Sequence, residues 1–403
     1  MRYDFTSIID RQGMDATALE LDAIKGWGLG QEVKPGVELI PMWVADMNFA
    51  ACPAIVNAMA RRVQHPLYGY FPIRGEYYDA IIGWQTARNQ VTGLAKECIG
   101  YENGVLGGVI SALNVLCSKG DKVLVHSPTY IGFTSSLSNN GYRIVHSPLY
   151  RDGQGVWRMD LADMEQKIIA NRIHAMVFCS PHNPCGRVWE RGELEEMVRL
   201  CEKYDVKIVS DEIWSDIIRP GCRHIPTQMV SEWARQNTVA LYAPSKTFNL
   251  AGLIGAYHII YNPTLRDRVE KESSLCHYND INVLSMHALI GAYGPEGAEW
   301  CNELCQTIAA NVDHACGFIA GRFEGVSVFK PQGTYMLFLD CTEWCKKHKM
   351  SIEELLKAGI WQGVLWQPGT MFHGPCHIRM NLALPLSRVQ EAFDRLDRFV
   401  FNA

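Results

Sequence analysis

The sequence lacks the long apolar run that marks a membrane protein. Around Lys246, the longest stretch without acidic or basic residues is Thr247–Leu265, and it contains two asparagines, a histidine and a proline. Such a composition makes a poor membrane span. Residues 1–13 also lack the apolar core of a secretory signal peptide. We therefore expect a cytoplasmic protein that does not cross a membrane.

An excess of basic charge is missing as well. The 403 residues include 38 Lys and Arg against 43 Asp and Glu, which gives a formal net charge of −5. A chain of this charge has no electrostatic attraction for nucleic acid, so we expect no such partner. The hydrophobic content of 48% and the charged content of 20% are ordinary for a globular protein of two or three domains.

Closely spaced cysteine pairs, which are typical of zinc sites, are absent. The 14 cysteines are scattered, and the pairs Cys301/Cys305 and Cys341/Cys345 are each four residues apart on segments that we predict to be helical. Zinc sites more often use tighter pairs, and a site at Cys341, Cys345 and His348 would still lack a fourth ligand. We therefore expect no metal, and free thiols that fit a reducing compartment.

The chain does contain short apolar strands that alternate with amphipathic helices. Helical spacing of apolar residues follows the strands, for example over residues 106–117 and 194–201. Such alternation predicts an α/β protein with a parallel sheet and right-handed crossovers. The segment from about 262 to 320 is predicted to be mostly helical, and a pair of strands is predicted over 327–340. The strands predicted for the sheet are residues 122–125, 175–179, 207–209, 239–242 and 256–261.

One stretch, TVALYAPSKTFNLAGLIG, places a lysine directly after a strand. Val239–Tyr242 is the strand, and a turn through Pro244 presents Lys246. An amine in apolar surroundings can have a lowered pKa, and a neutral amine can form a Schiff base with an aldehyde. A lone lysine in such a loop is more often a surface residue. Whether Lys246 is a Schiff-base lysine or an ordinary surface lysine depends on which residues follow the other strands.

Three other strands are also followed by residues that suit a ligand. Asp211 comes directly after a buried strand, where a carboxylate needs a cation or hydrogen-bond donors. Asn183 precedes Pro184 after another strand and is a plausible donor to a ligand hydroxyl. Tyr130, in SPTY, follows a third strand and could stack on a flat ring, because ligands bind at the carboxyl ends of such strands. Each residue alone could equally be part of the core or the rim.

Two further features suggest binding of anions. Gly104 and the Gly107–Gly108 pair lie at the start of a predicted helix, whose first-turn N–H groups can bind phosphate, although a tight turn is the commoner reason for such glycines. Arg379 lies between apolar residues in HIRMNLALP, so a carboxylate of the protein or of a ligand should meet it.

Taken together, these motifs resemble the fold type I enzymes that depend on pyridoxal 5′-phosphate (PLP). The resemblance covers about residues 41–385 and is carried by five segments in the same order: SPTY, NPCGR, SDEIW, APSKTFNLAGL and RMNLALP. More narrowly, the sequence is similar to the C–S lyase branch, the cystathionine β-lyase relatives of the MalY/PatB type. The phrases PMWVADMNFA, HPLYGY, SKTFNLAGL and PQGTYMLFLD carry that narrower likeness.

The resemblance implies a role for each candidate residue. Lys246 holds PLP covalently and moves the substrate α-proton. Asp211 pairs with the ring nitrogen, Tyr130 stacks on the ring, and both are expected to be catalytic. Asn183 donates to the ring's phenolic oxygen and contacts the substrate. The phosphate is expected to bind to Ser245 and to the backbone amides near Val105 and Leu106.

The substrate is expected to contact residues outside this group. Arg379 is implied to bind its α-carboxylate, and Ala45 is expected to lie beside it. Tyr70 is implied to reach the phosphate or the leaving group in the site of a second subunit. A homodimer with shared sites follows from that role of Tyr70 and not from composition.

Two positions depart from the wider superfamily. Many relatives have an arginine eight residues after the lysine, where this chain has Ile254. The lyase branch also tends to lack it, so its absence favours a lyase over an aminotransferase. Three residues after Asp211, where relatives carry Tyr or His, this chain has Trp214, which is expected beside the cofactor. Its indole is bulkier than Tyr or His and can only donate a hydrogen bond. We therefore expect Trp214 to influence the properties of the bound cofactor and which reaction follows.

The expected architecture is a large domain with a mostly parallel seven-stranded sheet flanked by helices, and a smaller α/β domain. We place an N-terminal arm at 1–47, the PLP-binding domain at 48–285 and the small domain at 286–403. The expected activity is β-elimination on L-cysteine S-conjugates such as cystathionine, which gives a thiol, pyruvate and ammonia. The alternatives are an aminotransferase, an amino-acid racemase and a regulatory PLP-binding protein.

Overall fold

The computed structural model describes residues 1–26, 32–275 and 278–402. It divides into two compact units, which are described separately. The large unit comprises Ala51–Asn183 and Arg187–Asn302, and the small unit comprises Met1–Ala50, Pro184–Gly186 and Glu303–Ala403. The domain boundaries expected from the sequence stay a prediction. Residues 27–31 of the predicted arm and 276–277 of the predicted helical segment lie outside the described residues.

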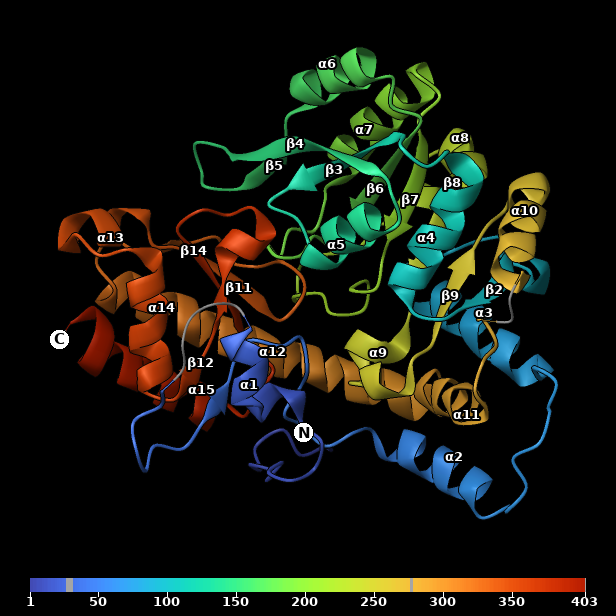
Figure 1. The fold of residues 1–403 in the computed structure, drawn as a ribbon. Helices are drawn as coiled ribbons and strands as arrows, with labels where there is room; N and C mark the ends of the chain where they lie inside the picture. Colours follow the sequence, from blue (N-terminus) through green and yellow to red (C-terminus); the bar gives the residue numbers. More distant parts are fainter. Residues whose placement is uncertain (27–31, 276–277, 403) are drawn as a thin grey trace. The chain divides into compact units, whose positions relative to one another are not determined.

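A mixed β-sheet forms the centre of the large unit (Figure 1). Strands β8, β7, β6, β3 and β4 are parallel neighbours, while β2 and β9 at one edge and β5 at the other pair antiparallel. The predicted α/β fold is confirmed. The predicted strand number of seven is wrong for the described part of the chain, because the short β5 pairs with the end of β4. In sheet order the strands are β2 (Ile99–Glu102), β9 (Ala256–Ile259), β8 (Thr238–Tyr242), β7 (Lys207–Asp211), β6 (Ala175–Cys179), β3 (Lys122–Ser127), β4 (Arg143–Arg151) and β5 (Trp157–Met159).

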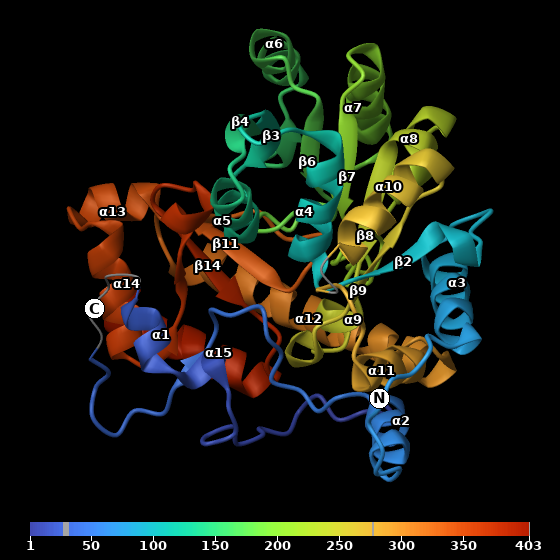
Figure 2. The same ribbon diagram turned by 45° about the vertical axis from the view of Figure 1, so that its right-hand side comes forward.

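Helices cover both faces of this sheet (Figures 1 and 2). On one face lie α4 (Val105–Leu116), α5 (Ile131–Asn139) and α10 (Pro263–Ser274), whose apolar side chains join those of the strands in one buried cluster. The other face carries α6 (Leu161–Asn171) and α7 (Arg191–Lys203), where the Cys201 thiol lies 3.5 Å from the Met176 sulfur of β6.

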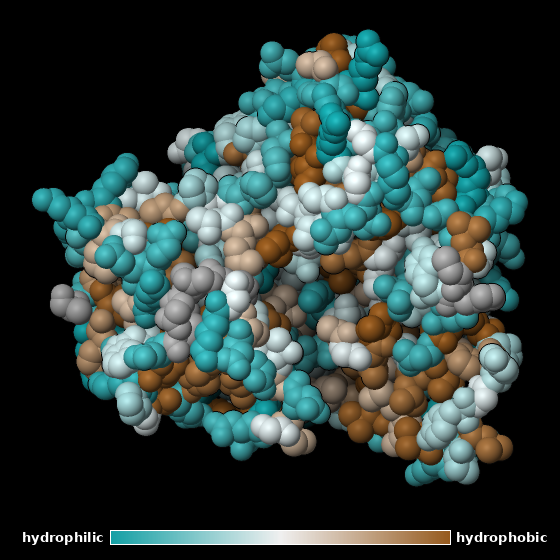
Figure 3. Space-filling model, viewed as in Figure 1, coloured by the Kyte–Doolittle hydropathy of each residue, from teal (hydrophilic) through white to brown (hydrophobic). Residues whose placement is uncertain are grey.

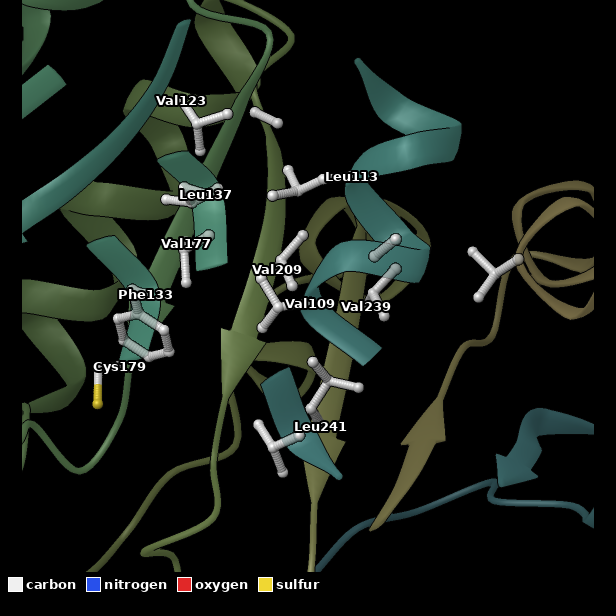
Figure 4. Close-up of a cluster of buried hydrophobic side chains, with 14 of the residues drawn as sticks. Val109, Leu113, Val123, Phe133, Leu137, Val177, Cys179, Val209, Val239 and Leu241 are labelled. Carbon is white, nitrogen blue, oxygen red and sulfur yellow. The ribbon is translucent and has the colours of Figure 1, made fainter. Parts of the chain in front are cut away.

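The core of the large unit lies between α4 and the central strands (Figure 4). Val109 and Leu113 of α4 face Val209, Val239 and Leu241 of the strands. Because both faces are covered, every residue of β8 is buried, as expected of a parallel strand with a continuous apolar run. Burial of each such side chain contributes about 1.5–3 kcal/mol. The turn that follows β8 therefore starts from a rigid support.

Helix α8 (Glu232–Asn237) contacts α7 and β7, and the remaining helices of the large unit lie beyond the sheet. Figures 1 and 2 show α2 and α11 side by side. Gly291 of α11 permits this contact, because a Cβ there would lie 2.8 Å from the Ala54 carbonyl oxygen and the Ala58 Cβ of α2. These helices are α2 (Pro53–Val63), α3 (Gly75–Asn89), α9 (Pro244–Thr247), α11 (Val283–Ala292) and the first residues of α12 (Pro295–Arg322).

The small unit has an antiparallel sheet in the order β10-β11-β14-β13, and β1 pairs in parallel with β12. The strand pair predicted over 327–340 is confirmed as β10 and β11. In the described part of the chain, we find no helix both long and apolar enough to span a membrane. The elements are β1 (Ile40–Pro41), β10 (Ser327–Val328), β11 (Met336–Asp340), β12 (Val364–Leu365), β13 (Gln367–Pro368), β14 (His377–Asn381), α1 (Leu21–Lys25), α13 (Thr342–His348), α14 (Ile352–Trp361) and α15 (Leu386–Leu396).

Candidate active site

Four of the candidate residues follow four neighbouring parallel strands. Lys246 comes after β8, Asp211 ends β7, Asn183 follows β6 and Tyr130 follows β3. Parallel strands end at the same edge of a sheet, so these residues share the edge where α/β proteins bind ligands. Strand β2 runs in the direction of β8, since both are antiparallel to β9, and it leads into α4. The N-terminus of α4 therefore lies at this edge too.

Asp211 is a buried carboxylate at the end of β7. It is 4% exposed, and the N–H of Ile213 donates to its Oδ1 at 3.0 Å. Burial raises the pKa of Asp211 to about 7, while the Ile213 N–H and the charge of Lys246 oppose that rise. A carboxylate with so little solvation gains most from a further cation beside it.

Lys246 lies on the short helix α9, which Pro244 begins. The Phe248 N–H donates to the Pro244 carbonyl at 2.9 Å and closes the turn. The Lys246 Nζ lies 5.9 Å from the centre of the Trp214 ring, and Trp214 is 2% exposed. The amine thus has the face of an aromatic ring near it and a carboxylate within electrostatic range.

The position of the Tyr130 ring depends on a glycine. A Cβ at Gly132 would lie 2.3 Å from Cε1 of Tyr130, so no larger residue fits while the ring stays in place. Tyr130 also meets Phe133 edge to face, with ring centres 5.4 Å apart. Asn183, from the next strand, is 3% exposed. An aromatic ring and an amide are therefore held at the edge that carries Asp211 and Lys246.

Helix α4 begins with an unblocked first turn. Gly104 has φ of +84° and makes no side-chain cap, and the Gly108 N–H donates back to the Gly104 carbonyl at 3.1 Å. The N–H groups of Val105 and Leu106 belong to the first turn, whose donors have no partner within the helix. A Cβ at Gly108 would lie 2.5 Å from the Leu241 side chain, so this glycine lets the helix start lie against β8. This geometry suits an anion such as a phosphate.

In the small unit, Arg379 of β14 is 3% exposed and is held from three sides. Its Nη2 donates to the Trp43 carbonyl at 3.1 Å and to Oε1 of Gln367 at 2.5 Å, and its guanidinium lies 4.3 Å from the centre of the Phe372 ring. These three contacts hold the guanidinium in one orientation.

The same strand also positions Ala45. The amide of Asn381 donates to the carbonyls of Val44 at 2.8 Å and Asp46 at 2.6 Å, one on each side of Ala45. The structure therefore brings Arg379 and Ala45 together through β14, as a group in the small unit.

Two positions lie apart from the residues above. Tyr70, in the loop between α2 and α3, has a relative exposure of 111%, so the fold of one chain does not bring it into a site. Ile254, where many relatives carry arginine, is 50% exposed with φ of +47°.

Two buried residues beside the lysine were missed by the sequence analysis. Asp216 is 6% exposed and accepts a hydrogen bond from Oγ1 of Thr247 at 2.8 Å. The available sign was a second aspartate, five residues after Asp211, in the segment SDEIWSDI. Nothing in the sequence indicated that Thr247 would be its partner.

The assembled groups fit PLP chemically. PLP has an aldehyde, a flat ring with a basic nitrogen, and a phosphate. An amine, an undersolvated carboxylate, an aromatic ring and a helix N-terminus lie at one sheet edge and match those features in turn. The Tyr130 ring lies where a Cβ at Gly132 would collide with it, so a side chain at position 132 would displace the ring.

Comparisons with known proteins agree with this fit. The profile of the family described as aminotransferase class I and II matches residues 38–396. Cystathionine beta-lyase PatB of Bacillus subtilis is 31% identical over 372 residues, which cover 92% of this chain and 95% of PatB. Protein MalY of Escherichia coli is 28% identical over 395 residues, 96% of each chain. The PLP-bound C–S lyase from Staphylococcus hominis superposes with a TM-score of 0.88 at 28% identity, over 99% of both chains. The chain belongs to the aminotransferase class I and II family.

Proposed function

We propose that this protein is a PLP-dependent β-lyase acting on L-cysteine S-conjugates such as cystathionine. In the overall reaction, the conjugate and water give a thiol, pyruvate and ammonia. The observation that carries the proposal is the pair of Lys246 and Asp211, whose charges interact at the ends of two neighbouring strands. The likeness to PatB and to the Staphylococcus lyase supports the choice of a carbon–sulfur bond.

Each end of the cofactor has a residue to hold it. Lys246 would hold the aldehyde carbon covalently, and Asp211 would pair with the ring nitrogen. Tyr130 stacks on the ring, and Asn183 donates to the phenolic oxygen. The phosphate binds to Ser245 and to the first-turn amides at Val105 and Leu106.

The protein's own groups move protons and exclude water around the substrate. When bound, PLP supplies an electron-withdrawing ring that stabilises negative charge on the substrate Cα. Once the substrate's amine has replaced it on the cofactor, the Nζ of Lys246 would remove the proton from Cα. Asp211 keeps a negative charge opposite the ring nitrogen, and the buried Trp214 excludes water beside the amine. The sulfur then leaves Cβ with the electrons of the broken C–S bond.

Substrate orientation is assigned to the small unit. Arg379 binds the α-carboxylate through a charge-assisted hydrogen bond, and the backbone at Ala45 borders the same carboxylate. The contacts of Arg379 with the Trp43 carbonyl and Gln367 support this role, because they hold the guanidinium in one plane.

A homodimer completes the proposal. Figure 3 shows hydrophobic residues gathered over α2 and α11, where Val56 and Val63 of α2 are 48% and 49% exposed. In the loop that follows, Leu67 and Tyr70 are 69% and 111% exposed. Exposed apolar surface of this kind is typical of a protein interface. We propose that a second copy covers it, and that Tyr70 reaches the second copy's site as a ligand of the phosphate or the leaving group.

Product analysis tests the proposed reaction. The purified protein with PLP is incubated with cystathionine, and with alanine plus a 2-oxo acid. Release of thiol and pyruvate without any 2-oxo acid supports the lyase. Strict dependence on a 2-oxo acid would assign an aminotransferase, the second candidate that the family supports. Inversion at Cα alone would indicate a racemase, and bound PLP without turnover would indicate a binding protein. Lys246→Ala serves as the control for all of these activities.

A further inference from the structure

Asp216 is a buried carboxylate that gathers donors from two elements, α3 and α9. The Thr247 hydroxyl donates to its Oδ2 at 2.8 Å, and the Trp84 Nε1–H lies 3.1 Å from Oδ1 and 3.2 Å from Oδ2. The Arg88 Nε is 3.4 Å from Oδ1. The Asp216 side chain is only 4% exposed. Its negative charge is therefore compensated by α3, which carries Trp84 and Arg88, and by the turn that carries Lys246.

The residue after Thr247 is also held firmly. Phe248 is fully buried at 0% exposure, and its ring lies 5.5 Å from the ring of Trp300 and 5.6 Å from that of Trp84. Trp84 in turn stacks on Tyr293 at 4.6 Å with the rings nearly parallel. The carboxyl side of the Lys246 turn is thus fixed by one buried hydrogen bond and one aromatic cluster.

A single segment supports the lysine at two points. The loop that begins at Asp211 places Trp214 5.9 Å from the Lys246 amine and then places Asp216 on the neighbouring threonine. The loop from Asp211 to Asp216 therefore positions both the Asp211 carboxylate and the backbone of the turn that carries Lys246. A catalytic lysine must swing its side chain between bonding partners while its Cα stays in place, and a misplacement of about 1 Å can cost about 100-fold in rate.

From these contacts we infer that Asp216 and Thr247 are positioning residues, which clamp the Lys246 turn so that its amine returns to one place relative to Asp211. The inference rests on the proposed role of Lys246. Neither residue is required to touch the substrate. The hydroxyl of Thr247 is the coupling group, because it is the only atom of that side chain that can donate a hydrogen bond to the carboxylate.

The test compares three threonine variants of the PLP-loaded enzyme. Thr247→Val keeps the shape and removes the hydroxyl, whereas Thr247→Ser keeps the hydroxyl. Thr238→Val is the matched control: this threonine is also fully buried, at the start of β8, and its Oγ1 has no hydrogen-bond partner in the described part of the chain. The measurements are kcat, KM, the melting temperature, and the pH midpoint of the visible absorbance of the lysine-bound cofactor.

Thr247→Val should lower kcat about tenfold, change KM less than about threefold, and shift the absorbance midpoint by about half a pH unit or more. Thr247→Ser and Thr238→Val should stay near wild type in all of these. If Thr247→Val does not fold, Asp216→Asn replaces it in the test. The amide NH2 group of this variant would face the Trp84 and Arg88 N–H groups, which also donate, so the clamp should loosen. The same changes in kcat, KM and absorbance midpoint are then expected.

Two results would overturn the clamp. One is a Thr247→Val enzyme with an unchanged kcat and an unchanged absorbance midpoint. The other is an equal loss of kcat in Thr247→Val and Thr247→Ser that follows their melting temperatures, which would mean packing alone. The proposed function fails separately, through a Lys246→Ala protein that keeps the visible absorbance.

Discussion

At the scale of single residues, the site depends on charged groups that the fold holds away from water. Asp211 and Arg379 are 4% and 3% exposed, so each holds its ionisable group almost out of contact with water. Burial of a charge without a counter-charge is costly, and natural proteins accept that cost mainly where a ligand supplies the counter-charge. The two residues therefore lead to separate predictions.

Asp211 should make the cofactor-free protein less stable as the pH rises. Burial raises its folded-state pKa to about 7 from an ordinary value of 3.8. Between these values the folded chain keeps the proton and the unfolded chain releases it, so rising pH favours unfolding. Relative to Asp211→Asn, the cofactor-free wild type should lose about 2–4 kcal/mol between about pH 4 and pH 7. Urea unfolding at several pH values measures this, and parallel curves for the two proteins would contradict it.

Arg379 should act on substrate binding. Loss of a charge-assisted hydrogen bond costs about 1.5–3 kcal/mol, so Arg379→Ala should raise KM by about 10- to 150-fold. Arg379→Lys should recover only part of that loss, because an ammonium lacks the rigid planar set of donors that meets Trp43, Gln367 and the substrate together. Steady-state kinetics on one S-conjugate measures both variants. A KM within twofold of wild type in Arg379→Ala would remove the assignment.

At the scale of elements, the site is built from turns whose positions depend on buried contacts with neighbouring elements. Gly132 lets α5 pass beside the Tyr130 ring. Behind Asp211, the carboxylate of Glu212 is fully buried and binds the His224 ring and the Tyr242 hydroxyl, each at 2.7 Å. Both features fix the turns that follow strands, so changing either should affect the site through the position of a whole segment.

Gly132→Ala should weaken cofactor binding without unfolding the protein. The new Cβ would lie 2.3 Å from the Tyr130 ring, which must move away. Loss of a well-placed aromatic contact costs about 0.5–1.5 kcal/mol, so PLP should bind about 2- to 12-fold more weakly. Gly83→Ala on α3 is the control, since a Cβ there meets nothing within 4 Å. Equal PLP affinity in the two variants, measured by equilibrium dialysis, would refute the prediction.

Glu212→Gln should destabilise the large unit. Removing the charge leaves buried donors of His224 and Tyr242 poorly paired, at a cost of about 3 kcal/mol. The control is Asp267→Asn, because Asp267 forms an exposed pair with Lys271 on α10, where both side chains are more than half exposed. Its loss should cost less than about 1 kcal/mol. Urea unfolding compares the two, and similar losses would mean that the buried network contributes no more than a surface pair.

At the scale of the whole molecule, the sequence predicted the elements with strong local patterns. Strand β6 was predicted with its observed bounds, since all five of its residues are apolar and buried. Strand β4 was missed because most of its residues are partly exposed, which leaves no clear apolar alternation. Of the apolar run over 39–44, only Ile40–Pro41 forms a strand, because its pairing is limited to the two residues of β12.

The candidate site could be predicted from the sequence where its residues lie in local motifs, but not where it depends on contacts between distant residues. Lys246, Asp211, Asn183 and Tyr130 each follow a strand in a short polar motif, so local sequence reveals them. The pairing of Asp216 with Thr247 joins residues 31 positions apart and depends on how two turns meet in space. No local pattern contains that information.

A shared site between two copies should show itself by complementation. Lys246→Ala and Tyr70→Ala proteins should each be nearly inactive alone. If each site combines Lys246 of one copy with Tyr70 of the other, re-associated mixtures should regain up to about a quarter of wild-type activity, because half of the dimers are hybrids with one intact site. No recovery from a mixture that sedimentation shows to contain hybrid dimers would refute the shared site.

The most direct measurement of the central claim is the location of the cofactor on the chain. The PLP-loaded protein is reduced with borohydride, digested, and its peptides are weighed by mass spectrometry. A pyridoxyl phosphate mass on the peptide that contains Lys246, and absent from the same peptide of the Lys246→Ala protein, is the predicted result. A label on a different lysine, or no label on a protein that still turns over substrate, would contradict the account.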